Sequence, residues 1–240
     1  MAEYSAALAS WQLGALGRAL VAAETQLLAE VCDDVFGLEL LQIGAWGLDR
    51  ELLRSSRVRR QTVIASLSAA GQKPDIVASA AGLPICSSSI DAVVLPHSLE
   101  IEPGPGAVLR EAERVLVGEG QLIVLGFRPW SLWGLRAEAS RSGYPPGFSR
   151  LLSERRLRDW LVLLGFEVTV ARHYLHVLPT EPRGAPAQTA LSMLRRGLFN
   201  PMPAGGYLLR ARKRVYAPTP LRQRRRERSS FVGSLVNPST

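Results

Sequence analysis

The feature that most constrains this 240-residue sequence is a short apolar run, Leu38–Ile43, which ends at once in the turn Gly44-Ala45-Trp46-Gly47. Residues 48–53 follow with a composition suited to starting a helix. The segment therefore predicts a strand, a tight turn and a helix. A strand that leads into a helix favours an α/β fold, because parallel strands must be joined by crossover connections.

The rest of the first half repeats this alternation. Short strands are predicted at residues 61–65 and, more weakly, at 75–77. Residues 90–96, IDAVVLP, form a continuous apolar run typical of a central strand covered on both faces. Helical spacing over 107–116 is stopped by Gly118-Glu119-Gly120, and another buried strand follows at 121–126. Alternating strands and helices predict a mostly parallel sheet with helices on both faces.

The two ends of the chain have different patterns. Apolar residues at helical spacing between Trp11 and Val35 predict one or two amphipathic helices. After Gly126 comes a long loop, rich in proline and aromatic residues, with some helix. A helix opened by Ser153 and ended by Gly165 is followed by strands at 166–170 and 206–215, which favour an antiparallel edge hairpin.

Together these elements predict a Rossmann-like α/β fold with a seven-stranded sheet. We expect an N-terminal helical segment (1–36) packed on a main domain (37–216), and a basic, disordered tail (217–240).

Composition limits the class of protein. The hydrophobic content of 47% is enough for a sizeable core. No basic stretch precedes an apolar one at the N-terminus, and the longest apolar run, 160–171, is broken by Gly165 and Glu167, so neither a signal peptide nor a membrane span is expected. Cys32 and Cys86 form no paired motif, which argues against a disulfide framework or a metal site. These features predict a cytoplasmic protein.

The net charge of +8 is concentrated near the C-terminus. Nine Lys or Arg residues and one Glu lie between Arg210 and Arg228, so this stretch alone contributes 9 − 1 = +8. A run of this kind is either a solvated tail or a contact for RNA or another anionic surface.

Four segments, LLQIGAWG, GLPICSSSIDAVVLPHSLE, EAERVLVGEGQLIVLGF and RPWSLWGLR, resemble the class I S-adenosylmethionine-dependent methyltransferases, specifically the methyltransferase type 11 group. The resemblance spans residues 40–136 and implies S-adenosylmethionine as the cofactor. A dinucleotide site fits less well, because the G-x-G-x-x-G spacing and its later acid are missing.

The resemblance places the cofactor against residues at the carboxyl ends of the strands. These are Gln42, Gly44, Ala45, Gly47, Ser66, Leu67, Ala80, Leu83 and Pro96. It also implies acidic residues at Gln42, at Ser66 for the ribose hydroxyls and near Ser79 for the adenine amine, and none of these is acidic here. Charge-assisted hydrogen bonds are stronger than neutral ones, so Gln and Ser would bind the cofactor less strongly than acids.

His97 follows the IDAVVLP strand and is the best candidate for a base or acceptor contact; a histidine that caps the strand end is the alternative. Trp130, Trp133 and Tyr144 are candidates for an acceptor pocket, although packing of the loop would explain them nearly as well. His173 and His176 would face opposite sides of one strand, so they predict no metal site.

Three functions follow from these observations. The first is methyl transfer to an unidentified acceptor. The second is a methyltransferase-fold binding protein with weak or no catalysis, favoured by the missing acids. The third assigns the arginine-rich tail a contact with RNA.

Overall fold

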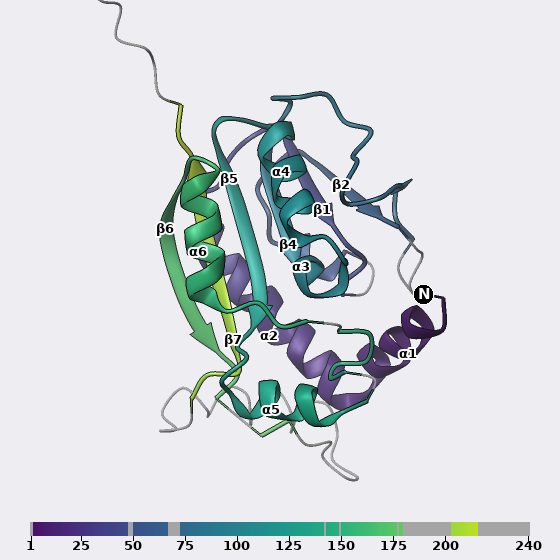
Figure 1. The fold of residues 1–240 in the computed structure, drawn as a ribbon. Helices are drawn as coiled ribbons and strands as arrows, with labels where there is room; N and C mark the ends of the chain where they lie inside the picture. Colours follow the sequence, from purple (N-terminus) through teal and green to yellow (C-terminus); the bar gives the residue numbers. More distant parts are fainter. Residues whose placement is uncertain are drawn as a thin grey trace, which may run out of the picture.

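Seven strands form one mixed sheet in the computed structural model, which describes residues 2–47, 50–66, 73–141, 143–148, 150–176, 178–179 and 203–215 (Figure 1). The strands are β1 (Glu39–Ile43), β2 (Arg60–Ala65), β3 (Ile76–Val77), β4 (Ile90–Pro96), β5 (Leu116–Phe127), β6 (Phe166–Tyr174) and β7 (Gly206–Lys213). Their order is β3-β2-β1-β4-β5-β7-β6. The first five are parallel, and β7 is antiparallel to both β5 and β6. The predicted parallel sheet with an antiparallel edge hairpin is confirmed.

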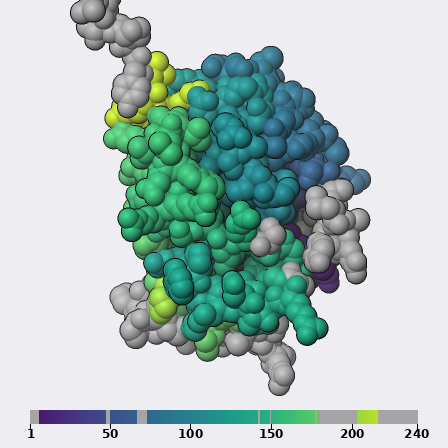
Figure 2. All heavy atoms as spheres, in the orientation of Figure 1, coloured from purple at the N-terminus to yellow at the C-terminus, as the bar shows by residue number. Residues whose placement is uncertain are grey.

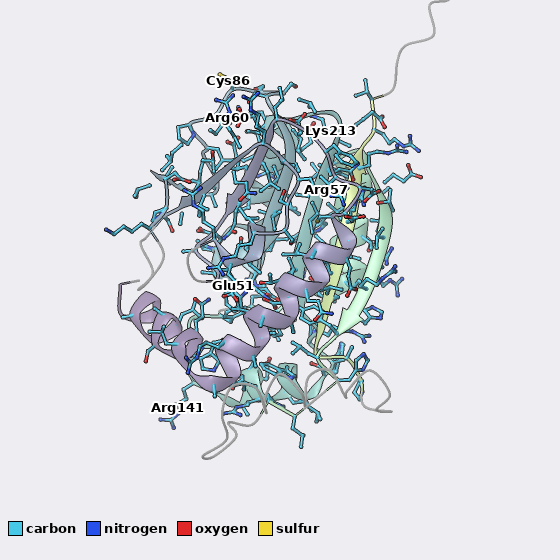
Figure 3. All side chains as sticks on the ribbon, turned by 180° about the vertical axis from the view of Figure 1, so that it is seen from behind. Glu51, Arg57, Arg60, Cys86, Arg141 and Lys213 are labelled. Atoms are coloured by element: carbon cyan, nitrogen blue, oxygen red, sulfur yellow. The ribbon has the colours of Figure 1, made fainter. Side chains whose placement is uncertain are left out.

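Helices cover both faces of this sheet. They are α1 (Ala2–Leu13), α2 (Ala15–Val31), η1 (Glu51–Leu53), α3 (Ser98–Ile101), α4 (Pro105–Val115), α5 (Leu132–Ala139) and α6 (Glu154–Leu163). Figure 2 shows α4 in teal and α6 in green on one face. From behind, in Figure 3, α2 crosses the other face.

Successive side chains of a pleated strand point to opposite faces of the sheet, so the central strands contribute to two separate hydrophobic cores. Leu40, Val63 and Val94 pack with Leu20 and other residues of α2 on one face. On the opposite face Leu41, Ile64 and Val93 pack with residues of α4 and α6, including Leu109 and Leu161. The predicted N-terminal helices therefore supply much of one core, and burial of such side chains is the main source of stability.

Two local predictions are wrong. Between β1 and β2 the described residues form only the one-turn 3-10 helix η1, not a longer helix, because Leu52 and Leu53 are its only buried side chains and Arg50 is left-handed (φ 58°). α4 passes directly into β5, so Gly118-Glu119-Gly120 lies within the strand. The register there jumps, with Ile90 paired to Leu116 and Ala92 to Gln121.

The helix before the edge hairpin begins as expected. Ser153 is the N-cap of α6 and its Oγ accepts from the backbone N–H of Arg156. Gly165 ends the helix with a φ of 80°. In the described part of the chain, no helix is long and apolar enough to cross a bilayer.

Candidate functional site

The carboxyl ends of β1, β2 and β4 lie together at one edge of the sheet, because β1 pairs in parallel with both neighbours. In open α/β sheets ligands bind in the crevice at this edge, where the strand order reverses. Here the order reverses between β1 and β4. The turn after β1 and the segment after β4 therefore define the candidate site.

The turn after β1 depends on two glycines with positive φ, Gly44 (106°) and Gly47 (85°). A side chain would be strained at either position. A Cβ on Gly44 would also come within 2.7 Å of Ser98 Oγ, which belongs to α3. Ser98 Oγ donates to the carbonyl of Ile43, so α3 is tied directly beneath the turn.

Gln42 supports this turn from below. Its Nε2 donates to the carbonyls of Gly44 (2.9 Å) and Trp46 (3.1 Å), and the side chain is fully buried. Its Oε1 is buried and has no hydrogen-bond partner among the described residues. An acid at this position could not donate to the two carbonyls, so Gln42 is not simply a weaker substitute for one.

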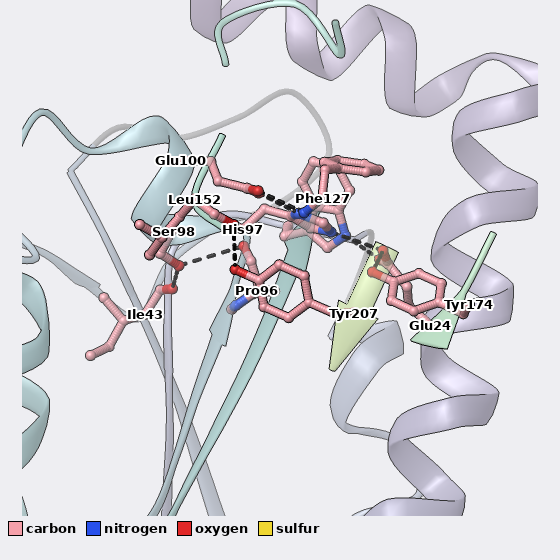
Figure 4. A network of polar contacts seen from close by, with 11 residues as sticks. Glu24, Ile43, Pro96, His97, Ser98, Glu100, Phe127, Leu152, Tyr174 and Tyr207 are labelled. Atoms are coloured by element: carbon pink, nitrogen blue, oxygen red, sulfur yellow. Dashed lines mark hydrogen bonds and ion pairs between the residues drawn. The ribbon is translucent and has the colours of Figure 1, made fainter. Parts of the chain in front are cut away.

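His97 lies immediately after β4 in a left-handed conformation (φ 58°) and is fully buried. Its Nε2 is 2.9 Å from Glu24 of α2, and its Nδ1 is 2.8 Å from Glu100 of α3 (Figure 4). Glu24 also accepts from Trp46 Nε1 (2.6 Å) and from the hydroxyl of Tyr174 (2.8 Å). The network thus joins the glycine turn, the end of β4, the end of β6 and α2.

The buried ionisable groups of this network shift one another's pKa values. Burial opposes the imidazolium of His97, but the carboxylates of Glu24 and Glu100 outweigh it and raise the pKa of His97 from 6.5 to about 9. Burial raises the pKa of Glu100, and the hydrogen bonds from His97 and the backbone N–H of Phe127 offset part of the rise. His97 therefore serves here as a charged link between two carboxylates. To act as a base, His97 would have to break its hydrogen bond to Glu24 or to Glu100.

Aromatic side chains surround His97. The rings of Trp46 and Phe127 each lie 4.4 Å from the imidazole, centroid to centroid. Further members of this aromatic cluster are Trp11, Trp133, Tyr144 and Phe148. Two of the three predicted acceptor residues, Trp133 and Tyr144, are thus brought together, with ring centroids 5.7 Å apart. Trp130 is not, since it is 86% exposed.

Of the remaining predicted cofactor residues, Ala45, Pro96 and Ser66 lie at this edge, whereas Leu83 is hydrogen-bonded to Glu111 and Arg114 in the C-terminal half of α4. Ala45 is half-buried in the glycine turn, and Pro96 ends β4. Ser66 follows β2, and its Oγ donates to Glu102 Oε1 at 3.4 Å. Ala80 and Leu83 are buried against the α4 core. Leu67 lies outside the described residues.

Glu24 and Trp46 are the main site residues that sequence reasoning missed. Leu20, Glu24 and Leu28 share one buried stripe of α2. A single acid on an apolar helical face is a detectable sign of a buried polar partner. No pattern in the sequence, however, indicates that Trp46 would turn toward α2.

Part of the basic stretch that was predicted as an interface forms ion pairs within the folded protein. Arg210 is nearly buried and pairs with Asp34 at 2.5 Å, and Lys213 pairs with Glu113 at 2.9 Å. Arg212 and Arg214 pair with Glu119 and Glu167. The arginines at 222–228 lie outside the described residues, so the contact with RNA stays a prediction that depends on them. In the described part no group of three His, Cys, Asp or Glu could hold a metal ion.

Comparison with known proteins gives a family model and a relative that match parts of this chain. A family model described as a methyltransferase domain matches residues 56–124. An uncharacterized protein of Escherichia coli K12, YafS, is 37% identical over 153 residues, which are 62% of this chain and 61% of YafS. This chain thus spans about three fifths of that relative's length.

Solved structures share the architecture. A SAM-dependent methyltransferase from Thermotoga maritima superposes with a TM-score of 0.62 at 18% identity, over 85% of this chain and 93% of that one. A geranyl diphosphate methyltransferase in complex with SAM gives 0.52 at 16% identity, over 80% and 85%. This chain therefore has the fold of S-adenosylmethionine-dependent methyltransferases.

Two features of the carboxyl edge of β1 suit a bound ligand. The two positive-φ glycines leave the turn after β1 without side chains, and Gln42 Oε1 is a buried acceptor without a partner. Both features favour close approach of a ligand that carries hydrogen-bond donors.

Proposed function

We propose that this chain binds S-adenosylmethionine at the carboxyl edge of β1, β2 and β4 and transfers its methyl group to an acceptor. The observation that carries the proposal is the turn between Gly44 and Gly47 above the unpaired Oε1 of Gln42. The sulfonium of the bound cofactor supplies an activated methyl group.

The chain's own residues would bind and orient. Gln42, Gly44 and Gly47 would contact the cofactor at the turn, and Ser66 would contact it at the end of β2. Trp133 and Tyr144 would form an apolar wall for the acceptor, excluding water from the reacting atoms. His97 would hold the backbone after β4 through Glu24 and Glu100.

Binding without methyl transfer is the second candidate. One observation favours it: no acid stands at Gln42, Ser66 or Ser79. On this proposal the fold is a ligand-dependent binding module.

Calorimetric titration distinguishes both candidates from a chain that binds no cofactor, and a methyl-transfer assay then separates the two candidates from each other. We expect S-adenosylmethionine and S-adenosylhomocysteine to bind the wild type, and Gly44→Ala to abolish binding because its Cβ would meet Ser98 Oγ at 2.7 Å in a left-handed backbone. Gly82→Ala is the matched control, since a Cβ there meets nothing within 4 Å.

Binding together with transfer of labelled methyl to a cell extract would support the enzyme. Binding without transfer would support the module. Absence of heat from either compound at millimolar concentration would refute both.

A further inference from the structure

The carboxyl edge contains a carboxylate that sequence reasoning did not assign. α3 ends at Ile101, and Glu102 is the next residue. The segment Glu102-Pro103-Gly104-Pro105 ends the helix. A residue before proline is held in an extended conformation, and Glu102 has a ψ of 137°. The backbone thus leaves the helix at Glu102 while its N–H still donates to Ser98 O.

α3 directs Glu102 across the edge of the sheet. Ser98, at the start of α3, is tied beneath the turn after β1. Four residues on, the Glu102 carboxylate reaches the end of β2, where its Oε1 accepts from Ser66 Oγ. Glu102 comes after β4 in the chain, yet its carboxylate lies beside the end of β2, which is two strands away from β4 in the sheet.

This carboxylate is open to a ligand. Glu102 is only half-buried, and among the described residues no basic side chain pairs with it. Burial raises its pKa, and the hydrogen bond from Ser66 offsets part of that rise. An unpaired acid of this kind at a ligand-binding edge is a functional-site candidate.

We propose that Glu102, together with Ser66, binds the ribose diol of an adenosine-containing ligand. One carboxylate can accept from two neighbouring hydroxyls, and each hydrogen bond to an ionised acceptor is about twice as strong as a neutral one. Ser66 alone could offer only a neutral hydroxyl. The acid expected at the end of β2 is thus supplied from the end of α3, and this assignment depends on the cofactor binding proposed above.

The test uses Glu102→Gln, because the amide oxygen can still accept from Ser66 while the charge is lost. The ligands are S-adenosylhomocysteine and its 2′-deoxy and 3′-deoxy analogues, titrated by calorimetry against the full chain. We expect the wild type to bind the parent compound about tenfold more tightly than either analogue, and Glu102→Gln to reduce that ratio to about twofold. Glu39→Gln is the control, since it removes the same charge at the amino end of β1.

The pH dependence provides a second measurement. In the wild type, protonation of Glu102 on acidification should reduce the ratio between parent and deoxy compounds, whereas the ratio in Glu102→Gln should not change with pH. A ratio that is the same in both proteins would overturn the role of Glu102 while leaving cofactor binding intact. A wild type that binds none of the three compounds would refute both proposals.

Discussion

At the scale of single residues, Gln42 is the residue whose meaning changes most between sequence and structure. Compared with the family pattern it is a missing acid, and restoring Glu would be expected to strengthen the site. In the structure its Nε2 donates to two carbonyls, so a carboxylate there would face two acceptors at about the same positions. A buried charge opposite acceptors is strongly unfavourable.

We therefore expect Gln42→Glu to weaken the protein. Its free energy of unfolding in urea should fall by about 3 kcal/mol, because one buried acceptor replaces the donor on which the glycine turn depends. Affinity for S-adenosylhomocysteine should fall as well.

Gln121→Glu is the matched change, since Gln121 Oε1 already accepts from Arg210 Nε at 3.1 Å. This variant should stay within about 0.5 kcal/mol of the wild type. A Gln42→Glu variant as stable as the wild type that bound the cofactor more tightly would contradict this role of Gln42 and show that the position takes an acid, as the sequence resemblance implies.

At the scale of elements, the buried network of Glu24, His97, Glu100 and Tyr174 fastens α2 to the ends of β4 and β6. The pKa of His97 is raised from 6.5 to about 9 in the folded protein. A group whose pKa is higher in the folded than in the unfolded state stabilises the fold fully below the unfolded pKa. That contribution is lost as the pH rises through the folded pKa.

The wild type should therefore lose about 3 kcal/mol of unfolding free energy between pH 6.5 and 9, as measured by urea denaturation at a series of pH values. His97→Asn tests the cause, because Asn tolerates the left-handed backbone at this position but does not titrate. It should be less stable at pH 6.5, and its stability should change little over the same range. An equal slope in both proteins would show that another group is responsible.

The strands were predictable from the sequence because buried parallel strands have continuous apolar runs, and IDAVVLP became β4 with unchanged bounds. The length of the helix expected after the glycine turn was not predictable in this way. The residues beyond Leu53 are polar, so only one turn has side chains to bury. In the candidate site, the glycines and His97 were identifiable from their place after strands. The contacts of Glu24 and Glu102 depend on tertiary packing, which brings α2 and α3 to residues far away in the sequence.

At the scale of the whole molecule, the excess charge lies in two stretches that behave differently. Residues 210–214 contain four basic residues, and all four pair with acids on α4, β5, β6 or the segment after α2. Residues 217–240 contain five arginines and one glutamate, so they contribute 5 − 1 = +4 of the total of +8. Any free positive surface near the C-terminus must therefore come from the second stretch.

Deletion of residues 217–240 tests this assignment. If the five arginines contact RNA, the full chain should bind a single-stranded RNA with a slope of log K against log salt of about −3.5, since each neutralised phosphate contributes about −0.7. The shortened chain should lose that slope and most of its affinity, because the arginines of β7 are already paired. Replacing the five arginines by Lys, which keeps the charge, should preserve the slope. Binding that survives the deletion unchanged would mean that RNA contacts the folded domain instead, and would remove the tail from the function of this methyltransferase fold.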